Sequence, residues 1–92
     1  MDIIAIRTTE EFLKKSPKNT AIVHLHGGQT YETKLIYKII EPTVTNFQPL
    51  IVIDVQVEGE DLAIIPVAHI SHIIIKGPEK EMKVGFFIEK TS

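Results

Sequence analysis

The feature that most constrains the fold is a pair of alternating segments on either side of Gly27 and Gly28. Apolar residues occupy every second position over residues 20–26, and the same period continues from 31 to 40. A two-residue period is typical of a half-buried strand. A glycine pair between two such segments supplies the positive φ of a primed hairpin turn. The pattern therefore predicts an antiparallel β-hairpin.

Three further segments have strand character, namely 50–57, 62–65 and 72–76. Pro42 and Pro49 bracket a loop over 41–49, because proline disfavours strand pairing. An acidic turn with Glu58, Glu60 and Asp61 and a tight corner over 66–69 make the remaining connections. This order predicts a mainly β fold, a small and strongly bent five-stranded antiparallel barrel. A last strand is expected within 82–89.

The first 19 residues predict a strand followed by a helix. Residues 3–6 form a short apolar run fit for a strand, and the Thr8 to Glu11 spacing matches a capping box. We therefore expect a helix of about two turns over residues 8–15 that ends before Pro17.

A chain of 92 residues has room for one domain. We divide it into an N-terminal strand and helix (1–19), the barrel (20–76) and a C-terminal extension (77–92). The 16 isoleucines suit a core of pleated strands. The residues expected to point inward are Val23, Leu25, Tyr31, Leu35, Ile51, Ile53, Val55, Ile65, Ile70 and Ile73.

Charge and targeting signals narrow the function classes. The net charge is -2 and Arg7 is the only arginine, which disfavours general nucleic-acid binding because phosphate contacts draw on clustered Lys and Arg. No apolar run is long enough for a membrane span, and the first residues do not resemble a signal peptide. The expected location is the cytoplasm, with no membrane contact.

Residues 23–35 resemble the first Sm motif, with Leu25, Gly28, Tyr31 and Leu35 on the matching positions. Residues 64–73 resemble the closing strand, corner and strand of Sm-like and bacterial Hfq-like barrels. The resemblance covers about two thirds of the chain. It implies the small-barrel fold and a ring or another assembly through β-strands.

The positions that bind RNA in those families are not matched. Gly27 stands at the usual Asp or Asn of the turn, and Thr33 at the glycine of the strand bend. The Asp-x-x-x-Asn element, the Arg-Gly pair and the Lys-His pair have no counterpart. The resemblance therefore implies the scaffold, and RNA remains an alternative partner that the charge disfavours.

Histidines are the candidate metal ligands. His24 and His26 stand two apart on one predicted strand, so their rings are expected on one face about 7 Å apart. Such a pair binds Zn²⁺, Ni²⁺ or Cu²⁺ when a third ligand arrives. We favour a solvated strand face instead, and likewise treat His69 and His72 as polar residues at a corner. No metal or cofactor is expected.

The loop over 41–49 holds the other candidate site, Asn46 and Phe47. An exposed aromatic side chain beside an amide is suited to stacking on a nucleic-acid base. Phe47 as a cap on one end of the barrel is the favoured alternative. No nucleophile elbow, triad context or phosphate-binding glycine loop is present, so we expect no enzyme.

Two functional hypotheses remain. The first is a self-assembling or protein-interaction module, expected as a homo-oligomer or bound to another protein by edge-strand pairing. Its expected interface residues are Ile73, Ile74, Ile75, Val84 and Phe86. The second is an Sm-like RNA-binding oligomer with an altered pocket. We favour the first because the chain lacks a concentrated basic surface.

Overall fold

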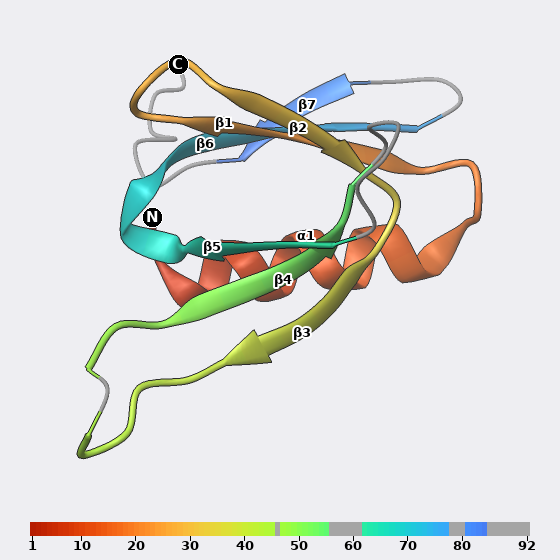
Figure 1. The fold of residues 1–92 in the computed structure, drawn as a ribbon. Coiled ribbons are helices and arrows are strands. Elements are labelled where there is room, and N and C mark those ends of the chain that lie inside the picture. Colours follow the sequence, from red (N-terminus) through yellow and green to blue (C-terminus); the bar gives the residue numbers. More distant parts are fainter. Residues whose placement is uncertain (46, 56–61, 78–80, 85–92) are drawn as a thin grey trace.

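A computed structural model of the chain, which describes residues 1–45, 47–55, 62–77 and 81–84, is mainly β with one N-terminal helix (Figure 1). This confirms the expected fold class. Its elements are α1 (Ile3–Lys15), β1 (Thr20–Leu25), β2 (Thr30–Thr33), β3 (Ile36–Ile40), β4 (Leu50–Asp54), β5 (Leu62–Pro66), the 3-10 helix η1 (Val67–His69), β6 (Ile70–Lys76) and β7 (Glu81–Val84).

The strands form two antiparallel sheets. The first has four strands in the order β2-β1-β6-β7, and the second has three in the order β3-β4-β5. Over the described ranges, no strand pairing joins the two sheets into one closed ladder. The chain passes between them at the bend from β2 to β3 and at the η1 corner from β5 to β6. Strands occur in each of the segments expected to form the barrel, but the strand expected over 31–40 is divided between the sheets. Of the strand expected over 50–57, β4 covers Leu50–Asp54, and residues 56 and 57 lie outside the described residues.

Thr33 makes the bend between β2 and β3. Its side chain is fully buried, and its hydroxyl donates to the Leu35 carbonyl at 2.9 Å. The same hydroxyl accepts from the Leu35 N–H at 3.1 Å. A threonine side chain that bonds to nearby backbone offers the chain an alternative to strand pairing. The hydroxyl therefore gives the Leu35 N–H its acceptor at the point where the strand leaves one sheet for the other, while the Leu35 carbonyl also accepts from the Asp54 N–H at 3.2 Å.

This bend overturns the prediction that Leu35 lies in the core. Leu35 is 38% exposed, whereas the next residue, Ile36, is 3% exposed. Buried Thr33 and buried Ile36 are three positions apart, so the two-residue period is interrupted at the bend. A single interrupted step moves every following side chain to the other face. Ile36 consequently takes the core position predicted for Leu35.

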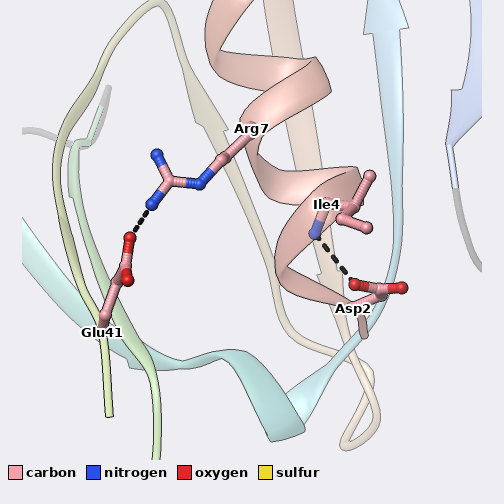
Figure 2. Close-up of polar contacts among 4 residues, drawn as sticks. All are labelled: Asp2, Ile4, Arg7 and Glu41. Carbon is pink, nitrogen blue, oxygen red and sulfur yellow. Dashed lines mark hydrogen bonds and ion pairs between the residues drawn. The ribbon is translucent and has the colours of Figure 1, made fainter. Parts of the chain in front are cut away.

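The predicted strand over residues 3–6 is wrong, because these residues begin α1. Asp2 is the N-cap, and its side chain accepts from the Ile4 N–H at 2.9 Å (Figure 2). Such a cap satisfies a backbone donor that the first turn leaves open. Thr8 does not cap the helix, since its hydroxyl donates back to the Ile4 carbonyl at 3.0 Å. The helix is therefore longer than expected, at 13 residues.

One side of α1 is apolar and packs into the core. Ile6 is fully buried and Leu13 is 5% exposed. Their spacing of seven residues places both on one face of a helix. On the exposed side, Arg7 forms an ion pair with Glu41, at the end of β3 (Figure 2). The helix is thus joined to the core by apolar packing and to the three-stranded sheet by charge.

The hairpin between β1 and β2 is confirmed, but its turn differs from the predicted one. Only Gly28 has a positive φ, of 96°, among the described residues. The Gly28 N–H donates to the Leu25 carbonyl at 3.0 Å, and the Leu25 N–H donates to the Gln29 carbonyl at 2.9 Å. These bonds match a three-residue hairpin loop whose last residue is left-handed, rather than a two-residue primed turn.

The core lies between the two sheets and α1. Of the residues expected inside, seven are buried, namely Val23, Ile51, Ile53, Val55, Ile65, Ile70 and Ile73. Leu25 and Tyr31 are half-buried against that core. Sequence reasoning did not assign Ile6, Leu13, Ile36, Val67 and Ile75 to the core, which they also form. Both sheets therefore contribute to one apolar cluster.

Candidate functional site

The structure brings His24 and His72 together across β1 and β6. The two residues are direct partners in the ladder. Their ring centroids are 4.3 Å apart and the ring planes differ by 14°, so the imidazoles are stacked. The Ser71 hydroxyl lies 3.0 Å from Nδ1 of His72. This pair was not predicted, because it depends on the register between two strands far apart in the sequence.

The predicted pair of His24 and His26 does not form a shared strand face. β1 ends at Leu25, and its register with β6 shifts between His24 and Leu25. His26 is exposed and follows the strand, where its backbone N–H donates to the His69 carbonyl at 2.9 Å. All four histidines therefore lie near the junction of β1 with η1 and β6, although only two rings stack.

The histidine pair is not arranged as a metal site. A ring nitrogen binds a metal through a lone pair in the plane of the ring, and lone pairs of two parallel rings do not converge on one ion. Within the described part of the chain, no three His, Asp or Glu residues are grouped to hold a metal ion. Nε2 of His24 is buried and has no hydrogen-bond partner among those residues. The stack acts as packing between β1 and β6.

The loop between β3 and β4 extends away from the two sheets (Figure 1). Phe47 is 80% exposed and Val44 is 87% exposed. The favoured interpretation of Phe47 as a cap on the barrel is therefore wrong, because its ring is not covered by the core. Asn46 lies outside the described residues, as do Glu58, Glu60 and Asp61.

Of the interface residues predicted near the end of the chain, those on β6 lie in an inner strand. β6 lies between β1 and β7, so residues 73–76 offer no free edge in the single chain. Ile73 and Ile75 are buried, and Ile74 is half-buried. Val84, on the outer strand β7, pairs with Ile73. Phe86 lies outside the described residues.

The most exposed apolar strand is β5, at an edge of the three-stranded sheet. Leu62 is 50% exposed and Ile64 is 66% exposed, whereas Ile65 is 4% exposed. This alternation buries one face of the strand and exposes the other. On the exposed face, Ile64 lies beside Val52 of β4, its partner in the ladder. β5 therefore combines an unpaired backbone edge, within the described residues, with apolar side chains open to solvent.

Comparisons with protein-family models, with curated proteins and with solved structures find no match to this chain. Among the described residues, no helix has the length and apolar character needed to cross a membrane. A function for this chain therefore has to be inferred from its own geometry.

Proposed function

We propose that this protein is a non-enzymatic, self-assembling interaction module that acts through an edge strand. The observation that carries the proposal is the β5 edge with its exposed Leu62 and Ile64. An unpaired apolar edge is a template for pairing with another strand. A domain of this size also has a small core, and assembly is one of the ways by which small domains gain stability.

We further propose that the scaffold is of the Sm-like small-barrel type. The order of elements supports this, since a helix precedes β1, a bent segment (β2 and β3) follows it, and the η1 corner joins β5 to β6. β1 lies between β2 and β6, and β4 lies between β3 and β5. The absence of cysteine suits a reducing compartment, and we propose the cytoplasm.

Light scattering of the purified chain over micromolar concentrations tests the assembly. We expect a mass above that of one 10.4 kDa chain, rising with concentration. A monomer at every concentration would overturn the self-assembly proposal. The absorbance ratio at 260 and 280 nm of the same sample reports any nucleic acid that copurifies.

A second candidate, an RNA-binding oligomer with an altered pocket, is favoured by one observation. Phe47 is 80% exposed on the extended loop, and an aromatic ring in that position is free to stack on a base. Fluorescence anisotropy with oligo-U and oligo-A tests it. Sub-micromolar affinity at ~150 mM salt, lost in Phe47→Ala and kept in Val44→Ala, would place RNA binding first. Because the net charge is -2, we expect weak or no binding.

A further inference from the structure

Among the described residues, the outer strands of the two sheets differ in charge. β2 contains Glu32, β3 contains Lys38, and β7 contains Glu81 and Lys83, whereas β5 contains no charged residue. Charged residues on edge strands are a common protection against unwanted pairing. In the part of the chain that the structure describes, β5 is therefore the edge without a charged residue, and Pro66 at its end is its only residue of a protective type.

The backbone of β5 also faces the right way for pairing. The Val67 N–H donates to the Pro49 carbonyl at 2.9 Å, on the side of β4. Because backbone groups alternate in direction along a strand, those of Ile65 and Ala63 point to the same side. The N–H and C=O groups of Ile64 and Leu62 consequently point away from β4. The backbone of Pro66 also points away from β4, so its missing N–H costs the ladder between β4 and β5 no hydrogen bond.

The edge is complementary to itself. If a second β5 pairs antiparallel around Ile64, then Ile64 lies opposite its own copy and Leu62 lies opposite Pro66. This register aligns all five residues of the strand, and any other register aligns fewer. Because Pro66 has no N–H, the Leu62 carbonyl of the other copy receives no ladder hydrogen bond from it. Ile64 then exchanges both backbone hydrogen bonds with its counterpart. No charge is brought against another charge or against an apolar side chain.

Resting on the proposed self-assembly, we infer that the partner of this edge is β5 of a second copy, in a two-fold symmetric dimer. The two three-stranded sheets then join into one continuous sheet, with Leu62 and Ile64 of both copies together on its outer face. Pairing β5 with β2, β3 or β7 instead would lay charged strands against this apolar edge. Two-fold pairing also uses β5 in both copies, so the edges left outside are the charged ones and growth ends at two.

Cysteine substitution tests the symmetry directly, because the chain has no cysteine of its own. In the proposed register the two Ile64 Cα atoms are about 5.5 Å apart, within disulfide range. Two Leu62 residues are separated by four positions along the strands, roughly 13 Å. We expect Ile64→Cys to form a covalent dimer under mild oxidation at least ten times faster than Leu62→Cys. Ile4→Cys, an exposed position on α1, serves as the background rate.

A second variant tests the energetics. Ile64→Lys places two ammonium groups opposite each other across the two-fold axis, and we expect the dimer dissociation constant to rise at least tenfold. Ile4→Lys is the matched control, because Ile4 is 68% exposed and Ile64 is 66% exposed. Circular dichroism checks that both variants fold, and Ile64→Thr replaces Ile64→Lys if the lysine variant does not.

The outcomes separate this inference from the proposal on which it rests. An unmodified chain that stays monomeric overturns both. An oligomer in which Ile64→Cys crosslinks no faster than Leu62→Cys overturns the two-fold β5 pairing, and leaves self-assembly through another edge in place. Rapid crosslinking of Ile64→Cys together with dissociation by Ile64→Lys supports both.

Discussion

The two sheets share one core but differ in how they meet solvent. In the four-stranded sheet, both edge strands contain charged residues, and the stacked His24 and His72 join its central strands. The three-stranded sheet ends at β5, an uncharged strand with two exposed apolar side chains. Among the described residues, the outer strands of the first sheet carry charges that disfavour edge pairing, whereas β5 of the second sheet carries none. The surface that we propose for assembly is thus separate from the edges that carry charge.

The largest expected effect tests whether the two sheets form one folding unit. Ile53 belongs to the three-stranded sheet and Ile73 to the four-stranded one, and both are fully buried. Replacing either with alanine should cost about 2–5 kcal/mol, because it leaves a cavity. Urea unfolding followed by circular dichroism measures the loss. Val44→Ala, on the exposed loop between β3 and β4, is the control and should change stability by less than about 0.5 kcal/mol.

If the sheets share one core, each alanine variant should still unfold in a single transition with an unchanged slope in urea. Two separate transitions would show that the sheets unfold independently. That result would mean that each sheet has a core of its own.

The next effect concerns the bend that joins the sheets. Thr33→Val keeps the shape of the side chain but removes its hydroxyl, which bonds both backbone groups of Leu35. We expect a loss of about 1–3 kcal/mol in the free energy of unfolding, because the Leu35 N–H loses its acceptor, whereas the Leu35 carbonyl keeps its bond from the Asp54 N–H at 3.2 Å. Thr30→Val, at the exposed start of the same strand, is the matched control. Equal stability of the two variants would contradict the role assigned to the hydroxyl.

The smallest expected effect concerns the ion pair between α1 and the three-stranded sheet. Arg7 and Glu41 have side chains that are 48% and 58% exposed. An exposed pair of this kind contributes about 0.2–1 kcal/mol, and less as salt screens it. A double-mutant cycle of Arg7→Ala and Glu41→Ala at low and high salt measures the coupling. Coupling above that range, or unchanged in high salt, would contradict a surface pair.

The sequence predicted the strands well where the side-chain period was unbroken. Val23, Ile51 and Ile53 lie where alternation places them, and the corner before β6 needed only Pro66 and its flanking apolar residues. The prediction that Leu35 is buried was wrong because the strand bends at Thr33, whose hydroxyl bonds to the backbone of Leu35. A glycine would have been the usual sequence signal for such a bend. No local pattern marks that interruption.

The helix start and the candidate sites were harder to predict for a different reason. Ile3, Ile4 and Ile6 have strand propensity, yet the Asp2 cap and the burial of Ile6 select a helix. The stack of His24 on His72 depends on a register between distant strands, and the open β5 edge depends on which strands end a sheet. Both properties arise from topology, which side-chain periodicity alone does not specify.

The pairing of β1 with β6 has a consequence for how the chain folds. Val23 pairs with Ile73, so more than half of the chain lies between these partners. Every other ladder joins strands that are neighbours in sequence among the described elements. Bringing β1 and β6 together closes a long loop, and the chain loses conformational entropy before the hydrogen bonds of the ladder have formed. We therefore expect β3, β4 and β5 to assemble early, with the β1–β6 ladder limiting the rate at milliseconds or slower.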